Sequence, residues 1–401
     1  MTTFAISGYE AASDTLRNQQ LAQSLYDEGA VIMQDVLLVL HGAPHRARRL
    51  LELRVFQRDF LRHYEQSVFP ATLAQTMAQT ALRGRADLMD LGYGITMNLT
   101  ADFAGVDRLR GDTAETSALR RMVGIFGEGA TLVHSTRDKN QVRAEVRAAL
   151  DEFQTRFYQP SMERRRALVA RFDAGDIADD ELPRDVLTVL LRNEDKVELA
   201  PDLMMREIAF YLQAGSHSTA NATTHAYHDV VTWCAAHPAD ADRIRTDPLF
   251  LQRCVHESLR LHPASPVAER RPTCPVTLAG DAGMAGVVDT VVVNMAAANR
   301  DPTVFGADAE NFNPHRSLPA GIPPWGLTFG VGSHTCLGRD LDGGMLPRAD
   351  VDPATHQYGI VPLLVRALLE RNARPDPDRP ATRSDQTERP NWGCYPILLD
   401  A

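Results

Sequence analysis

A long stretch without proline, between Pro201 and Pro238, constrains the fold most strongly. Ala200-Pro201-Asp202 has the form of a helix start, apolar residues then recur at helical spacing, and Pro238 ends the pattern after His237. At 1.5 Å per residue, a helix of this length extends about 50 Å. A helix that long crosses a whole domain, so the rest of the chain must pack around it.

The remainder of the chain also favours helices. From about Glu10 to Asp195 apolar residues recur every three or four positions, including a long basic amphipathic run at 45–66, with a polar loop at 170–185. After the long helix we expect a helix at 251–263, strands at 276–280 and 287–297, an ordered meander at 299–328, a segment rich in helix breakers at 341–359 and a helix at 359–372. With no repeat or linker, residues 1–401 are expected to form a single, mainly α domain with a minor β-sheet region.

The composition narrows the class of protein. The net charge is −10, which argues against non-specific nucleic-acid binding. The chain start lacks a basic region followed by an apolar run, and no stretch reaches the roughly 18 apolar residues of a membrane span. The five cysteines are an odd number without a CxxC pair, as in reduced proteins. We therefore expect a soluble, cytoplasmic protein.

Residues 329–338, FGVGSHTCLG, indicate a bulky ligand. Cys336 follows His334 and lies among Gly330, Gly332 and Gly338. Glycine lets the backbone approach a large or flat group closely, and a thiolate is both a soft-metal ligand and a nucleophile. Something large is therefore expected against this loop.

Glu257 and Arg260, in HESLRLHP, lie three residues apart on one helix face, and Arg316 in FNPHR could share the carboxylate. Pairs at this spacing are usually exposed to solvent. The flanking leucines and Val255 make this helix largely apolar, which favours the alternative of a buried pair.

A second motif, AGSHST at 214–219, interrupts the long helix with small and polar residues. One interpretation is close packing against a neighbouring element. The other is a local opening of the helix, in which freed carbonyls and hydroxyls hold water or a ligand.

Together, and in this order, the motifs resemble those of the cytochrome P450 family. A small and polar stretch in a long helix precedes ESLR, then ANRDPTVFG and FNPHR, and finally FGVGSHTCLG. The last motif agrees with the family's cysteine loop at every fixed position. The resemblance is firm from about Pro201 to Leu341 and continues more faintly through GAPHRARR, residues 42–49, toward the N-terminus.

The resemblance implies a haem b cofactor with Cys336 as the axial thiolate ligand of the iron. It implies that the glycines of the loop let the backbone pass close to the porphyrin, and that a helix after Cys336 adds a positive dipole end. Glu257, Arg260 and Arg316 would form a buried triad that holds the cysteine loop. The other residues that would contact the haem, those of the propionates included, are His45, Arg49, Ala214, Gly215, Arg270, Phe329, Gly330, His334 and Gly338.

The implied activity is that of a haem-thiolate monooxygenase, which inserts one oxygen atom from O2 into a small, apolar organic substrate. The thiolate promotes O–O cleavage by donating electron density. Electrons would come from a ferredoxin and its reductase, docked on a basic patch with Arg46, Arg48 and Arg339 as candidates. No membrane or nucleic-acid partner is expected. Candidate substrate-pocket residues are Gln213, Ala214, Ala264, Ser265, Val267 and 392–395.

Three departures from the family pattern leave alternatives open. His217-Ser218 stands where the family has an acid and an alcohol. Either the pair relays protons, since an unperturbed histidine has a pKa of roughly 6.5, or only Ser218 with water serves. The family's N-terminal segment is expected to be shortened. Asp342 replaces the customary alanine, and residues 343–358 interrupt the following helix. The rival functions are a peroxide-driven or non-hydroxylating haem-thiolate enzyme and a non-catalytic haem-binding protein.

Overall fold

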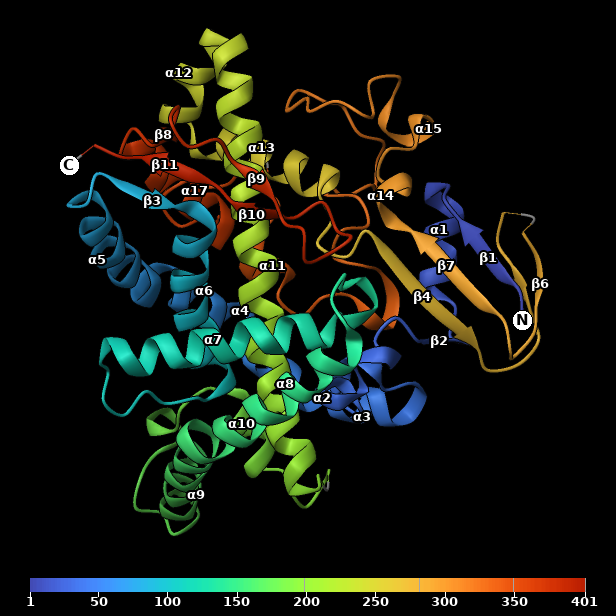
Figure 1. Cartoon of the computed structure of the whole chain (residues 1–401), viewed down its shortest axis with the longest axis vertical. Helices are drawn as coiled ribbons and strands as arrows, with labels where there is room; N and C mark the ends of the chain where they lie inside the picture. Colours follow the sequence, from blue (N-terminus) through green and yellow to red (C-terminus); the bar gives the residue numbers. More distant parts are fainter. Residues whose placement is uncertain (198, 281, 349, 401) are drawn as a thin grey trace.

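The predicted long helix is α11, Pro201–Ala236, which runs through the molecule (Figure 1). The computed structural model describes residues 1–197, 199–280, 282–348 and 350–400. Pro201 occupies the first turn of α11, and the backbone N–H of His237 closes the last turn onto Trp233 O. α11 packs most extensively against α6 (Leu88–Ala104), α7 (Thr113–Ala130), α13 (Pro248–Leu261) and α17 (Ile360–Glu370). The expectation of a long central helix is confirmed.

The other helices are shorter. They are α1 (Tyr9–Arg17), α2 (Ala30–Met33), α3 (Gly42–Glu52), α4 (Arg58–His63), α5 (Phe69–Ala81), α8 (Lys139–Phe153), α9 (Gln159–Asp173), α10 (Val186–Leu191), α12 (Pro238–Thr246), α14 (Met295–Ala298), α15 (Pro302–Phe305) and α16 (Arg339–Asp342). The basic run at 45–66, expected as one amphipathic stretch, is divided by a 3₁₀ turn at Leu53–Phe56 and a π turn at Tyr64–Val68. The polar loop expected from residue 170 begins only after Asp173, where α9 ends.

The strands form small sheets beside the helices (Figure 1). The largest has the order β1-β7-β4-β2, with β1 (Thr3–Ile6) parallel to β7 (Thr290–Asn294) and the other pairs antiparallel. Its remaining strands are β4 (Val267–Pro272) and β2 (Leu21–Gln23). The shorter sheets consist of β3 (Arg85–Asp87), β11 (Pro396–Leu398) and β8 (Arg374–Pro375), of β9 (Thr382–Arg383) and β10 (Trp392–Cys394), and of β5 (Val276–Leu278) and β6 (Gly283–Ala285). This mainly helical architecture with a minor β region is the predicted fold class.

The segment after the cysteine loop departs from the dipole expectation. α16 spans only the four residues Arg339–Asp342, too short to build a substantial helix dipole behind Cys336. The described residues between Gly343 and Gly359 form no helix, and α17 begins at Ile360. Buried Glu65 secures this connection, because its carboxylate accepts hydrogen bonds from Tyr358 N (2.7 Å) and Gly359 N (3.0 Å).

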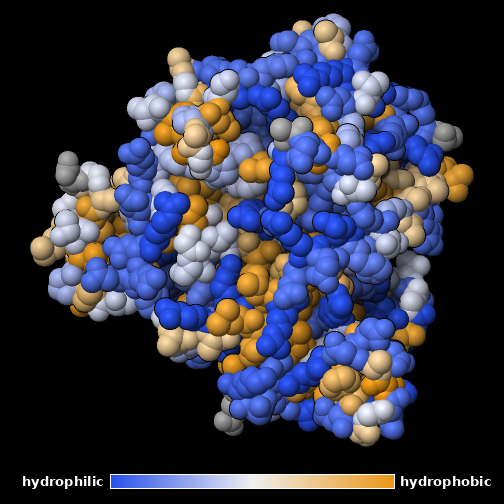
Figure 2. All heavy atoms as spheres, turned by 180° about the vertical axis from the view of Figure 1, so that it is seen from behind, coloured by the Kyte–Doolittle hydropathy of each residue, from blue (hydrophilic) through white to orange (hydrophobic). Residues whose placement is uncertain are grey.

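One face of the molecule is largely polar. Hydrophilic residues cover most of the face shown in Figure 2, and apolar residues form separate patches among them. Among the residues that the structure describes, no helix is long and apolar enough to cross a membrane.

Candidate active site

Backbone hydrogen bonds hold the cysteine loop in a compact conformation. The N–H of Cys336 donates to Phe329 O (2.8 Å), and that of Gly330 donates to Leu327 O (2.8 Å). Gly330 and Gly332 have φ angles of 64° and 78°, values that favour glycine. A β-carbon at Gly332 would also approach Cα of Arg17 to 3.1 Å. Glycine is therefore required at these two positions by the turn itself.

The Cys336 side chain faces an internal space. Its side chain has accessible surface, yet the protein that surrounds it raises the pKa of the thiol to about 11. Asp342 raises this pKa further. The backbone N–H of Gly338 acts in the opposite direction. A side chain that is enclosed by protein and still has free surface borders a hollow rather than bulk solvent. A metal ion in that hollow would deprotonate the thiol.

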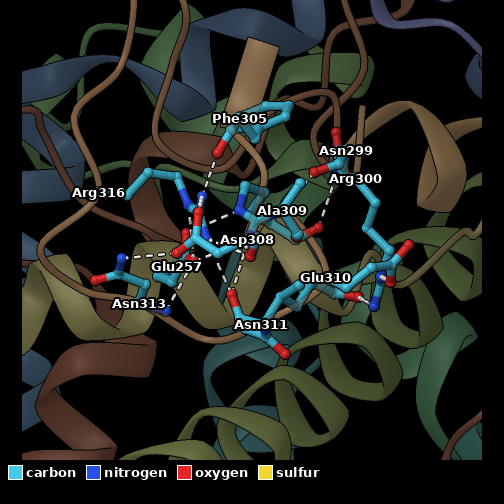
Figure 3. A network of polar contacts seen from close by, with 12 residues as sticks. Glu257, Asn299, Arg300, Phe305, Asp308, Ala309, Glu310, Asn311, Asn313 and Arg316 are labelled. Atoms are coloured by element: carbon cyan, nitrogen blue, oxygen red, sulfur yellow. Dashed lines mark hydrogen bonds and ion pairs between the residues drawn. The ribbon is translucent and has the colours of Figure 1, made fainter. Parts of the chain in front are cut away.

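A buried ion-pair network surrounds Glu257 (Figure 3). Arg260 binds both carboxylate oxygens of Glu257, with Nε–Oε2 and Nη2–Oε1 distances of 2.8 and 2.7 Å. Arg316 donates from Nε to Glu257 Oε1 (3.2 Å) and from Nη1 to Asp308 Oδ1 (2.6 Å). Arg260 has no exposed surface and Glu257 is buried. The prediction of a buried triad is confirmed, and the alternative of a surface pair is wrong.

Asn299, which the sequence analysis did not single out, links this network to the loop. Arg260 Nη1 donates to Asn299 O (2.6 Å), and Asn299 Nδ2 donates to Arg260 O (2.9 Å). Asn299 Oδ1 also accepts from Leu327 N (2.7 Å), two residues before Phe329. Asn299 thus connects Arg260 of α13 to Leu327, where the chain approaches the cysteine loop.

Four basic side chains lie close to the loop without an acidic partner. The rings of His45 and His334 are 4.3 Å apart, and Arg49 Nη2 donates to Thr335 O (2.5 Å). Arg270 is 3% exposed, and its hydrogen bonds go to Gln23 Oε1 and Glu269 O. Within the described ranges, none of the four forms an ion pair with a carboxylate. Buried cations are normally paired, so this set fits a ligand that brings its own carboxylates, as haem does with its two propionates.

Burial has a consistent effect on these groups. It lowers the pKa of His45 to about 4 and that of His334 to about 3, with further lowering from neighbouring cations. It also lowers the pKa of Arg270 to about 10. A nearby anion would reverse these shifts, because it favours the charged forms.

The small and polar stretch of α11 is packed closely, and the helix stays continuous through it. A β-carbon at Gly215 would meet Thr100 Cγ2 at 2.4 Å, and Ser216 Oγ bonds Thr100 Oγ1 (2.7 Å). Ser218 Oγ donates to Ala214 O (2.6 Å) inside the helix. The expected alternative of an opened helix is therefore wrong for this structure. Ala214, Gly215 and Ser218 nevertheless keep partial exposure in the middle of a buried helix, as residues bordering the hollow would.

His217 is held between two other elements. Its Nδ1 bonds the hydroxyl of Tyr93 in α6, and Asn391 Nδ2 donates to its Nε2 (3.4 Å). Burial lowers the pKa of His217 to about 4, with a further lowering by Arg389. The unperturbed value assumed from the sequence therefore does not apply, and the ring is neutral near pH 7.

Asp342 also contacts α11. Its Oδ1 accepts from Thr219 Oγ1 (2.7 Å), and burial raises its pKa to about 7. The customary alanine position thus carries a half-buried carboxyl group beside the helix that bears Ser218.

The expected basic docking patch loses one member. Arg48 is buried, and its Nη1 donates to Glu207 Oε2 (2.8 Å) and Asp35 O (2.7 Å). Arg46 is exposed as predicted, whereas Arg339 pairs with Asp340 (2.7 Å). Arg48 points inward because it lies on the face of α3 that packs on the core.

Comparisons with known proteins agree with this geometry. The family model described as Cytochrome P450 matches residues 137–342. The Cytochrome P450 family protein EryCII of Saccharopolyspora erythraea is 45% identical over 94 residues, which is 23% of this chain and 24% of that protein. For the first curated relatives the chain spans a quarter of their length or less.

Solved structures extend the likeness over the whole chain. The crystal structure of CalO2 superposes with a TM-score of 0.73 at 20% identity, covering 98% of this chain and 90% of that one. CYP109E1 from Bacillus megaterium, solved with testosterone, gives 0.71 at 18% identity, with 100% and 94% covered. P450BioI, solved with an acyl carrier protein, gives 0.72 at 16% identity, with 99% and 92% covered. At these identities the likeness shows the fold.

Family model, fold and cysteine loop thus lead to one assignment. Cytochrome P450 proteins bind haem b through a cysteine thiolate, and the lone cysteine of the loop faces an internal space beside unpaired basic groups that suit the propionates. The chain therefore belongs to the cytochrome P450 family of haem-dependent oxidoreductases.

Proposed function

We propose that the protein is a haem-thiolate monooxygenase that inserts one oxygen atom from O2 into a small organic substrate. The observation that carries the proposal is the placement of Cys336, which faces an enclosed space at the end of a turn fixed by glycine. When bound there, haem supplies the oxidising chemistry that its thiolate ligand favours. Cys336 would hold the iron, Phe329, Gly330 and Gly338 would line the loop side, and Ala214 and Gly215 the α11 side.

The basic groups would orient the cofactor. Arg49 and Arg270 would bind propionate oxygens through charge-assisted hydrogen bonds, and His45 and His334 would add neutral N–H donors. The network of Glu257, Arg260 and Arg316 would act at a distance, by keeping the loop rigid.

Proton delivery would depend on Ser218 and His217. The Ser218 hydroxyl would hold a water molecule on the α11 side of the cofactor. A neutral His217 could pass a proton only by accepting at one ring nitrogen while donating from the other, since its folded-state pKa is about 4. His217→Ala tests this relay. If it operates, peroxide leakage per NADH consumed rises while substrate affinity is kept, and unchanged coupling assigns the role to Ser218 and water alone.

The ligand assignment has a direct spectroscopic test. Reduced wild-type protein with carbon monoxide should show the strongly red-shifted absorption of thiolate ligation, and Cys336→Ala should lose it. Cys274→Ala is the matched control, because Cys274 lies outside the loop and contacts Gln20. A red-shifted spectrum that survives in Cys336→Ala would overturn the assignment.

A ferredoxin-type donor is part of the proposal. Exposed Arg46 would attract an acidic partner, so Arg46→Glu should slow reduction by ferredoxin and weaken its salt dependence. Reduction by dithionite should be unchanged. An equal effect on both reductants would contradict docking at this position.

One observation favours a second candidate, a peroxide-driven enzyme. Residues 214–219 of α11 carry no carboxylate, and the one histidine among them is neutral. Hydrogen peroxide supplies reduced oxygen together with its protons and needs no ferredoxin. Product formation with peroxide alone, at a rate above that with the full electron-transfer chain, would identify this candidate.

A further inference from the structure

Arg389 is a buried cation that neither the fold nor the haem contacts use. It lies between β9 and β10 near the C-terminus and is 7% exposed. Among the described residues its side chain forms one hydrogen bond, from Nη1 to Ala264 O (3.2 Å). Nε and Nη2 are buried and have no hydrogen-bond partner among the described residues. An isolated buried guanidinium is costly unless a counter-charge pairs with it.

The two unpartnered atoms share one edge of the guanidinium. Nε–H and the adjacent Nη2–H point in parallel, and this edge forms paired hydrogen bonds with the two oxygens of a carboxylate. Because Nη1 is held by Ala264, the side chain is fixed and the free edge is set before any ligand arrives.

Among the described residues, the side chains near Arg389 include further hydrogen-bond donors and no carboxylate that pairs with it. His134 Nε2 is also buried without a partner, and Arg389 helps to lower the pKa of His134 to about 4. The charge of Arg389 also helps to lower the pKa of His217, and burial lowers the pKa of Arg389 itself against the opposing influence of Tyr26 and Tyr93. Adjacent Glu388 is exposed, and none of the described carboxylates forms an ion pair with Arg389.

Arg389 is linked to one of the residues predicted to line the substrate pocket, and its neighbour Asn391 is linked to α11. Ala264 is one of the predicted pocket residues, and Asn391, two residues after Arg389, bonds His217 on α11. The groups assigned to the propionates are different ones, Arg49, Arg270, His45 and His334. Arg389 is therefore an additional cation beside the small and polar stretch of α11.

We propose that Arg389 binds the carboxylate of the substrate, through Nε and Nη2, so that the enzyme acts on organic acids with an apolar body. This inference rests on the proposed function, since it names the substrate class of the same site. The carboxylate would anchor one end of the substrate between the C-terminal hairpin and the turn that carries His134. The apolar remainder would extend toward Ala214 and Ser218.

The test compares acids with neutral analogues of the same shape. Haem-replete wild-type protein is titrated with 4-phenylbutanoate and with decanoate, each beside its methyl ester and primary amide, by isothermal calorimetry and by haem absorbance. We expect at least one acid to bind tenfold or more tightly than its ester and amide. Arg389→Met should lose this preference, and Arg389→Lys should keep part of it. Equal binding of acid, ester and amide in both series, or a preference that persists in Arg389→Met, would overturn the proposal.

Two controls separate the remaining interpretations. Arg383→Met removes an exposed cation of the same hairpin, whose guanidinium lies 3.6 Å from the centre of the Trp392 ring, and should leave the preference for acids intact. Without ligand, Arg389→Met should keep its haem and unfold at a higher temperature than the wild type, because an unpaired buried charge has been removed. Loss of haem from Arg389→Met would show that the guanidinium binds a propionate instead, which overturns the inference. The carbon monoxide spectrum of the same preparation reports independently on the proposed function.

Discussion

Two buried arginines, Arg260 and Arg389, differ in how their charge is satisfied. Arg260 has 0% exposure and uses all three nitrogens, on both oxygens of Glu257 and on three backbone carbonyls. Arg389 has 7% exposure, and its Nε and Nη2 have no partner within the described part of the chain. Burial alone therefore does not distinguish them. A buried arginine whose nitrogen atoms are all hydrogen-bonded within the protein indicates a structural role. A buried arginine with nitrogen atoms that have no partner indicates a position where a ligand supplies the partner.

The same contrast separates the two sides of the candidate haem site. The side behind the cysteine loop is closed by Glu257 and Asp308, which neutralise Arg260 and Arg316. Around the hollow, the partners of Arg270 in the described part of the chain are two neutral oxygen atoms, Gln23 Oε1 and Glu269 O. Removing one member of the network around Glu257 should lower the stability of the fold. Removing one of the basic side chains around the hollow should weaken the binding of haem.

The largest expected effect is that of Glu257→Gln. This change leaves two buried guanidinium groups without their shared counter-charge, which should lower the free energy of unfolding by about 3–5 kcal/mol. Urea denaturation and haem content measure the effect. The matched control is Glu370→Gln in the exposed pair with Arg366, where the loss should be under about 1 kcal/mol. Similar losses in both variants would remove the distinction between the closed network and a surface pair.

Arg270→Met should have an intermediate effect, and on binding rather than on folding. Hydrogen bonds to charged groups contribute about 1.5–3 kcal/mol, so haem should leave the variant roughly tenfold to a hundredfold faster. Transfer of haem to excess apomyoglobin measures the rate. Arg271→Met is the control, because this neighbour on β4 points outward and pairs with Asp27. An unchanged release rate for Arg270→Met would place the propionates elsewhere.

The effect that is smallest at neutral pH concerns His217, which has two neutral hydrogen-bond partners. Its pKa falls from 6.5 to about 4 on folding, so the unfolded chain takes up the proton first as the pH decreases. The corresponding stability is complete above about pH 6.5 and is lost as the pH falls toward 4. His217→Gln should therefore reduce the slope of stability against pH in this window by up to about 1.4 kcal/mol per pH unit.

Denaturant midpoints between pH 4 and 7 test this slope. His63→Gln, a change of an exposed histidine, serves as the control. If His217→Gln keeps the wild-type slope, the neutral state of His217 does not contribute to the acid sensitivity of the fold.

Local patterns in the sequence predicted much of the fold. Proline positions and apolar spacing located α11, α13 and α17 close to their observed ends, because those signals act within a few residues. The burial of the Glu257–Arg260 pair also followed from its apolar helix. The division of the run at 45–66 was not predicted, because its charged residues continue through the breaks.

Long-range contacts explain what the sequence did not reveal. His217 is fixed by Tyr93 and Asn391, which are 124 and 174 residues away along the chain. Nothing near position 217 predicts those partners or the lowered pKa that accompanies them. Arg389 lies in a polar turn sequence, TERPNW, typical of an exposed loop, and its burial depends on packing against residues 134 and 264. Arg48 was placed on the surface for the same reason.

The pairing of β1 with β7 has a consequence for how the protein is made. Thr3 of β1 lies beside Thr290 of β7, so β1 has no partner in this sheet until the chain has been synthesised as far as β7. At about 5–20 residues per second, β1 waits roughly 15–60 s on the ribosome. The cysteine loop at 329–338 emerges later still. We therefore expect the nascent chain to expose β1 to chaperones for tens of seconds, and haem to be acquired only after the cysteine loop has emerged from the ribosome.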